Sequence, residues 1–163
     1  MEGSLLFHLI FHFRWLLSGG LDGYVNVWDL TMGTCLHRFE HKGAITSFDF
    51  HPNEFLLSVA SEDKTITFYE VEHFTEVSSI EVSSVPKVIA FHPSGQNLIA
   101  GFEDCLQSIR WDPCEVIEDV SASLPNIADL VISRYHFFAA SIDGANCTLS
   151  KADSGVNTFL LLF

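Results

Sequence analysis

The chain has 163 residues, which is enough for one domain with a hydrophobic core. Apolar residues make up 48% of it and charged residues 18%, a balance that excludes an intrinsically disordered chain. The net charge of −13 repels phosphate backbones, so it argues against nucleic-acid binding and favours basic partner segments. The alternative is that this charge only keeps the protein soluble. The four cysteines form no Cys-x-x-Cys pair, so they predict a reduced intracellular chain and no zinc site.

Residues 1–13 form an atypical apolar segment that precedes the regular part of the chain. His8 and His12 interrupt its apolar run, which is too short to span a bilayer. Glu2 is the only early charge, so the basic start of a signal peptide is missing. We therefore expect a buried strand here and no membrane association.

A repeat of 41 residues follows. The triplet Phe50-His51-Pro52 returns as Phe91-His92-Pro93. Leucines, small residues and aspartates share the same offset: Leu16, Leu57 and Leu98; Gly19, Ala60 and Gly101; Asp22, Asp63 and Asp104. A period of this length is typical of repeat architectures.

Each unit consists of four short segments separated by turn signals. In the second unit the segments 44–50, 55–60, 65–71 and 76–80 are apolar or alternating, and no segment has a helical period. This pattern predicts an all-β fold of about four propeller blades near residues 14–40, 41–82, 83–122 and 123–163. The third unit holds one extra residue before its aromatic, which a β-bulge could absorb.

Residues 16–29 contain Leu-Leu-Ser-Gly-Gly-Leu-Asp-Gly and then Val-Asn-Val-Trp-Asp, which resembles the core of a WD (WD40) repeat. The resemblance implies a structural hydrogen-bond network of Trp, Ser, Asp and His in each blade. The matching residues are Ser18, Asp22 and Trp28 in the first unit, His41, Asp63 and Tyr69 in the second, and Asp104 and Trp111 in the third. The first unit has no matching His, and Val59 and Ala100 replace Ser in the next two, so we expect looser loops there.

Segments 44–57, 61–72 and 127–133, together with the block Trp111-Asp112-Pro113, resemble the regulatory, non-catalytic WD-repeat subunit of katanin. This resemblance covers residues 14–150. It implies a targeting subunit of a microtubule-severing complex, with the katanin catalytic ATPase subunit and microtubules as partners. It also implies a location in the cytoplasm, on microtubules, the centrosome or the spindle pole. The helical C-terminal domain through which that family binds the ATPase does not occur in this sequence.

About four blades are fewer than the seven that are common in WD propellers. We therefore expect an incomplete propeller, and a fragment or truncated gene product explains it best. A ring completed by a second copy and an open arc are the alternatives.

The sequence contains no Gly-x-x-x-x-Gly-Lys-Ser/Thr, His-Glu-x-x-His or Gly-x-Ser-x-Gly motif. We expect no catalytic, cofactor-binding or metal-binding residues and interpret the chain as a non-enzymatic interaction scaffold. A generic WD-repeat adaptor in ubiquitin ligation or trafficking is the alternative to the katanin subunit. The candidate interaction residues lie in turns at one end of the blades: Leu21, Glu62, Lys64, Phe102 and Glu103. Phe102 is either an exposed anchor or packed against the next blade.

Overall fold

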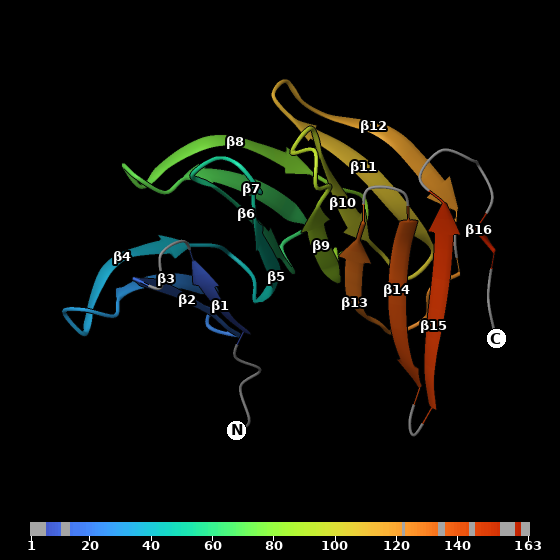
Figure 1. Ribbon diagram of the computed structural model, residues 1–163, viewed down its shortest axis with the longest axis horizontal. Helices are drawn as coiled ribbons and strands as arrows, with labels where there is room; N and C mark the ends of the chain where they lie inside the picture. Colours follow the sequence, from blue (N-terminus) through green and yellow to red (C-terminus); the bar gives the residue numbers. More distant parts are fainter. Residues whose placement is uncertain are drawn as a thin grey trace.

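The computed structural model of the chain describes residues 6–10, 14–121, 123–133, 136–143, 146–153 and 159–160. These residues form 16 strands in four antiparallel sheets of four strands each, which we call blades 1 to 4 (Figure 1). Their strands are connected in sequence order within each blade, so every turn joins neighbouring strands. The described residues include no helix that is long and apolar enough to cross a membrane.

The strand bounds repeat from blade to blade. Blade 1 contains β1 (Leu6–Ile10), β2 (Trp15–Gly19), β3 (Tyr24–Asp29) and β4 (Thr34–Glu40), and blade 2 contains β5 (Ile45–Phe50), β6 (Leu56–Ser61), β7 (Thr65–Glu70) and β8 (Thr75–Glu81). Blade 3 contains β9 (Val88–Phe91), β10 (Asn97–Gly101), β11 (Cys105–Trp111) and β12 (Cys114–Ser121). Blade 4 contains β13 (Ile127–Ile132), β14 (His136–Asp143), β15 (Asn146–Asp153) and β16 (Phe159–Leu160). Strand β1 lies within the apolar segment that precedes the repeats, and it pairs with β2 along its whole length.

Side-chain alternation explains why these segments are strands. In β3 the residues alternate between half-buried and buried positions, with Val25 and Val27 fully buried. β-Branched side chains suit such positions because they pack well on a pleated surface. The pairing of the third and fourth strands shifts register at Val27/Trp28, Phe68/Tyr69 and Ser108/Ile109. In all three blades the unpaired residue lies on the fourth strand, and β10 and β11 pair without a shift, so no bulge absorbs the extra residue of the third unit and that prediction is wrong. The extra residue instead makes β11 seven residues long where β3 and β7 have six.

Each pair of neighbouring blades encloses its own hydrophobic cluster. Leu17, Val25 and Val27 of blade 1 meet Leu57 and Tyr69 of blade 2. A second cluster joins blades 2 and 3, and a third joins blades 3 and 4. Because burial of apolar surface is the main stabilising term, each blade is stabilised chiefly by its neighbours.

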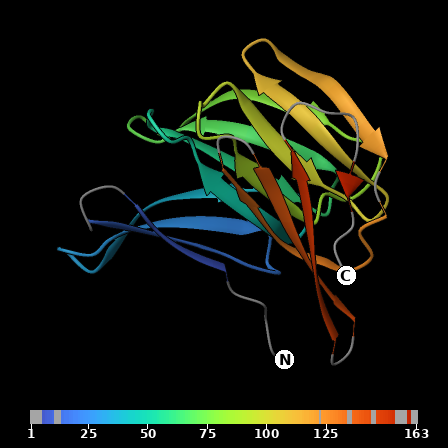
Figure 2. The ribbon, with the colours of Figure 1, turned by 45° about the vertical axis from the view of Figure 1, so that its right-hand side comes forward.

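The four blades follow one another in an arc, with blade 1 and blade 4 at its opposite ends (Figures 1 and 2). This confirms the predicted fold class, all-β blades in an incomplete propeller. The side of blade 4 turned away from blade 3 exposes Val131, Ile142 and Leu149, each more than half exposed.

Candidate functional site

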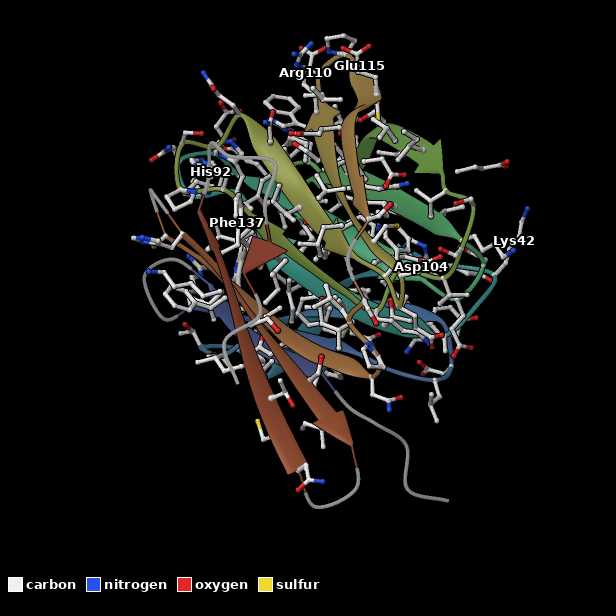
Figure 3. The ribbon with its side chains drawn as sticks, turned by 90° about the vertical axis from the view of Figure 1, so that its right-hand side faces the viewer. Lys42, His92, Asp104, Arg110, Glu115 and Phe137 are labelled. Atoms are coloured by element: carbon white, nitrogen blue, oxygen red, sulfur yellow. The ribbon has the colours of Figure 1, made fainter. Side chains whose placement is uncertain are left out.

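The blades present turns at two ends. One end, which we call the loop face, holds the turns between the second and third strands of each blade and the connections from one blade to the next. Residues 20–23, 41–44, 62–64, 82–87 and 102–104 make up its described part in blades 1 to 3. The other end, which we call the opposite face, holds residues 30–33, 51–55, 71–74, 92–96 and 112–113. Lys42 and Asp104 lie toward one end and His92 toward the other in Figure 3.

In blade 1 the structure brings together two of the three expected network residues. The indole Nε1 of Trp28 donates a hydrogen bond to Ser18 Oγ at 2.8 Å. Asp22 instead accepts a bond from the backbone N–H of Tyr24, at 3.2 Å, within its own turn. Gly23 completes that turn at φ +77°, and a Cβ at this position would lie 2.7 Å from the carbonyl oxygen of His41. Blade 1 thus joins its second and third strands through side chains and its loops through backbone contacts.

In blade 2 a carboxylate joins two loops. Asp63 accepts hydrogen bonds from Thr65 N at 3.0 Å, from Thr65 Oγ1 at 2.6 Å and from Lys42 N at 3.1 Å. A further hydrogen bond at 3.2 Å joins Tyr69 Oη and His41 Nε2. The Asp63 carboxylate therefore holds the turn at 62–64 against the connection from blade 1, and the bond between His41 and Tyr69 joins that connection to β7. This network forms although Val59 occupies the position expected for Ser.

The pKa values of these groups follow from their surroundings. Burial lowers the pKa of His41 and outweighs the attraction of Asp63 and Glu76, so the imidazole is neutral at pH 7. Burial alone would raise the pKa of Asp63, but the hydrogen bonds from Thr65 and Lys42 lower it overall. Burial, and then the charge of Glu76, raises the pKa of Tyr69 to about 12. In this network Asp63 is therefore charged and the neighbouring His41 is neutral at pH 7.

In blade 3 the structure does not bring the two expected network residues together. Asp104 lies exposed on the loop face. Trp111 is the last residue of the lengthened β11, and its Nε1 donates to the carbonyl of Gly95 at 3.2 Å, on the opposite face. Burial, and then the charges of Asp119 and Asp104, raises the pKa of the Cys105 thiol to about 11. Cys105 is consequently a neutral thiol and not a nucleophile at pH 7.

The candidate interaction residues divide into four exposed residues and one buried residue. Leu21 is 60% exposed in its turn of blade 1, and Glu62, Lys64 and Glu103 are exposed in the corresponding turns of blades 2 and 3. Phe102 is only 1% exposed and belongs to the cluster between blades 2 and 3, so its assignment to the interaction surface is wrong. A bulky aromatic ring next to a tight turn can point inward as readily as outward, and the ring of Phe102 packs inward between two blades.

The exposed charges of the loop face are held in place by neighbours. Lys64 has a φ of 66° and donates from Nζ to the carbonyl of Ser83 at 3.3 Å. Glu103 forms an ion pair with Lys87 at 3.5 Å. Between them lies a shallow hollow of about 440 Å³, lined by Lys64, residues 83–85, Lys87, Glu103 and Asp104.

The repeated Phe-His-Pro triplet predicts a structural role for His51 but does not identify its partner. His51 is 4% exposed, and its Nε2 donates to the carbonyl of Gly95 at 2.8 Å, across the junction of blades 2 and 3. Its Nδ1 accepts from the backbone N–H groups of Asn53 and Glu54. The same triplet gives His92 a different partner, Ser94 Oγ at 2.7 Å, so the motif alone does not specify the contact.

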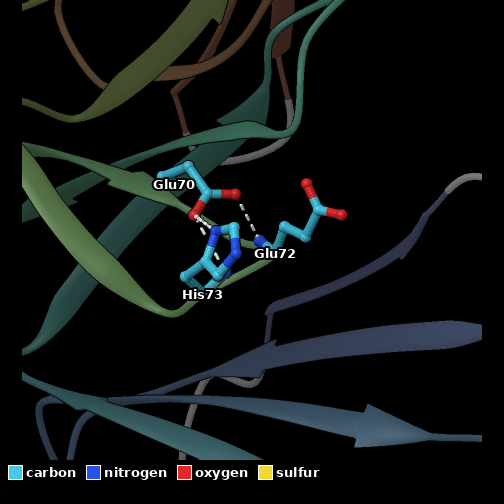
Figure 4. A group of neighbouring side chains, drawn as sticks. All are labelled: Glu70, Glu72 and His73. Carbon is cyan, nitrogen blue, oxygen red and sulfur yellow. Dashed lines mark hydrogen bonds and ion pairs between the residues drawn. The ribbon is translucent and has the colours of Figure 1, made fainter.

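Glu70, Glu72 and His73 form the one group of described residues whose ligand atoms lie close enough together to hold a metal ion (Figure 4). The Glu70 carboxylate already accepts hydrogen bonds from residues of the turn that follows it. It accepts from Glu72 N at 2.6 Å and from His73 N at 2.8 Å, and its Oε2 lies 2.9 Å from His73 Nδ1. Burial would raise the pKa of Glu70, but these bonds lower it overall. These hydrogen bonds cap the turn between β7 and β8.

Four-stranded antiparallel blades that pack face to face along an arc define the β-propeller class of repeat protein. Residues 8–29 and 33–70 match the family model described as "WD domain, G-beta repeat". The matched residues lie in blades 1 and 2. Blades 1 and 2 therefore correspond to WD repeats.

Three relatives illustrate how varied the matching proteins are. Mitochondrial division protein 1 of Vanderwaltozyma polyspora is 26% identical over 122 residues, 60% of this chain and 17% of that protein. Small ribosomal subunit protein RACK1 of Schizosaccharomyces pombe is 33% identical over 99 residues, 55% of this chain and 31% of that protein. The p21-activated protein kinase-interacting protein 1-like of Xenopus laevis is 23% identical over 107 residues, 65% of this chain and 30% of that protein. The chain thus spans less than a third of the length of each of them.

Proposed function

We propose that this WD-repeat protein is a non-enzymatic interaction scaffold that binds other proteins through its loop face. The observation that carries the proposal is the way in which Asp63 joins two loops and fixes the turn that presents the exposed Glu62 and Lys64. Leu21 is exposed in the corresponding turn of blade 1. Surface side chains on fixed turns lose little conformational entropy on binding. A central apolar residue with charged neighbours is the usual anatomy of a protein-binding patch.

The test is a comparison of binding partners between the full chain and a loop-face variant. Leu21→Ser, Glu62→Lys and Lys64→Glu together remove the apolar centre and reverse both charges while the net charge stays the same. Proteins labelled by proximity to the wild-type chain in cells, then purified and titrated against it, should lose at least about tenfold in affinity for the variant. A variant that folds normally and binds every such partner as tightly as the wild type contradicts a role for this face.

A narrower hypothesis is that the scaffold is a katanin-type regulatory subunit, which binds the katanin ATPase and microtubules and localises to the cytoskeleton. The block Trp111-Asp112-Pro113 supports it, and it forms the turn between β11 and β12. The three relatives described above are not katanin subunits, so this hypothesis rests on the sequence resemblance. Purified tubulin and katanin ATPase that fail to bind the full-length protein would favour a general WD-repeat adaptor instead.

A further inference from the structure

Two adjoining hollows lie on the opposite face, at the junction of blades 2 and 3. The first, of about 600 Å³, runs along the turns between β9 and β10 and between β11 and β12. The second, of about 500 Å³, runs along the turn between β7 and β8. Asn53, Glu54 and Trp111 line both hollows, so the two adjoin and are treated together as one recessed surface. We call it the junction groove.

Apolar side chains form part of the lining of the junction groove, and we call them its floor. Phe55 is 55% exposed, Val77 47% and Ile117 44%, and all three line the groove beside the half-buried ring of Trp111. They come from a turn of blade 2 and from the outer strands of blades 2 and 3. Single exposed apolar side chains need no explanation, whereas several gathered in one hollow indicate a binding surface.

The walls of the junction groove are fixed by two hydrogen bonds between the blades and one within blade 3. The carbonyl of Gly95 accepts from His51 Nε2 at 2.8 Å and from Trp111 Nε1 at 3.2 Å. Ser78 Oγ of blade 2 donates to the carbonyl of Trp111 at 3.1 Å. The groove is consequently formed before any ligand arrives, which reduces the entropic cost of binding.

The charge of the junction groove is negative. Glu54 lines both hollows, Glu70 and Glu72 line the second, and Asp112 lines the first. Arg110 is the only Lys or Arg among the lining residues, and its Nη1 forms an ion pair with Glu115 at 2.7 Å (Figure 3). A groove with this rim in a chain of net charge −13 attracts cationic ligands and repels anionic ones.

We infer that the junction groove binds a basic peptide segment of a partner protein, with one bulky apolar side chain on the floor and Lys or Arg side chains against the acidic rim. The groove lies on the face away from Leu21, so the inference stands independently of the proposed loop-face function. An apolar floor and an acidic rim together select such a segment over a nucleic acid, which the rim repels, and over a neutral apolar helix, which leaves the rim unpaired.

The test uses the full chain and an array of short labelled peptides with a central Phe, Leu or Trp flanked by Lys and Arg, read by fluorescence polarisation. A matching array with Glu in place of Lys and Arg is the ligand control. We expect binding from the basic array alone, with an affinity that falls as salt rises. Glu54→Lys with Glu72→Lys should lower the affinity at least about tenfold.

Two matched variants separate a specific groove from general attraction to an acidic chain. Glu40→Lys with Glu81→Lys makes the same change in net charge at exposed positions outside the groove, and it should leave the affinity nearly unchanged. Phe55→Ala should weaken binding, whereas Leu21→Ala, an exposed apolar residue on the loop face, should not. Thermal unfolding of each variant checks that it folds.

Three outcomes would overturn the inference. The first is that no basic peptide binds. The second is that both charge-reversal variants lose affinity equally, which would indicate only long-range attraction. The third is binding that requires added Zn²⁺ and disappears in His73→Ala, which would indicate a metal site at Glu70, Glu72 and His73 instead. A loop-face variant that keeps all of its partners, in a chain that still binds the basic peptides, would count against the proposed function and not against the groove.

Discussion

Replacing Gly95 by alanine tests the packing between blades 2 and 3. Gly95 has a φ of +77°, a conformation that L-residues adopt only at a cost of about 1–2 kcal/mol. A Cβ there would lie 2.4 Å from Nε2 and 2.5 Å from Cε1 of the buried His51. The imidazole must therefore move, although its Nε2 donates to the carbonyl of the same glycine.

The expected loss of stability follows from three contributions. The positive φ costs about 1–2 kcal/mol. Displacing a well-packed ring costs about 1–3 kcal/mol, and a buried N–H that loses its acceptor costs about 1–3 kcal/mol. Since the last two partly overlap, we expect Gly95→Ala to lower the free energy of unfolding by about 3–5 kcal/mol. For a chain of this size that corresponds to a fall of roughly 10 °C in Tm.

Gly33 provides a matched control within the same chain. Its φ is +64°, and nothing lies within 4 Å of a Cβ built there. Gly33→Ala should therefore lose only the backbone contribution, about 1–2 kcal/mol. In a His51→Ala background the ring is absent, so Gly95→Ala should also fall to about 1–2 kcal/mol.

Urea unfolding followed by tryptophan fluorescence measures all of these variants. Equal losses for Gly95→Ala and Gly33→Ala would refute the role of the His51 ring. So would a loss for Gly95→Ala that stays undiminished when His51 is absent.

Three further predictions concern the packing and the loop-face network. Phe102→Ala should lower the free energy of unfolding by about 3–5 kcal/mol because the ring is buried. The exposed Leu21 is the control, since Leu21→Ala should change the free energy of unfolding by less than about 0.5 kcal/mol. Thermal unfolding measures both variants, and similar values would contradict the burial of Phe102. Trp28→Phe should lower the free energy of unfolding by about 1 kcal/mol because the hydrogen bond to Ser18 is lost. A double-mutant cycle with Ser18→Ala should give a coupling energy of that size, and additive losses would show that the bond contributes nothing to stability. The pKa of Asp63 is lowered from 3.8, so its charged form stabilises the fold above that pH, and this stability is lost as the pH falls through the lowered value. Asp63→Asn should therefore reduce the free energy of unfolding at pH 7 and flatten the acid limb of a curve of stability against pH. An unchanged acid limb would contradict the assignment.

The repeat itself determined much of the fold. An offset of 41 residues, alternating apolar positions and turn residues at fixed places together predicted four-stranded blades, because local propensity and side-chain period specify strands and hairpins without long-range information. The same pattern placed Ser18 and Trp28 on neighbouring strands, where they are hydrogen-bonded.

Contacts between blades depend on how the sheets pack, and the sequence does not encode them locally. Phe102 has the same turn neighbourhood whether it is exposed or buried, and only the adjoining blade decides that it is 1% exposed. Two identical Phe-His-Pro triplets gave His51 a partner in another blade and His92 a partner within its own turn.

In β11 the place of Trp28 opposite the repeated leucine is occupied by Ile109, and Trp111 lies two residues further along the strand. Its ring is therefore away from the loop-face network, in a junction that also forms an acidic, apolar groove. The sequence by itself therefore determined the blades, because strand formation is a local property. The tertiary structure decided which of their side chains are exposed and able to bind a partner. The reason is that the burial of a side chain depends on which side chains of the neighbouring blade pack against it.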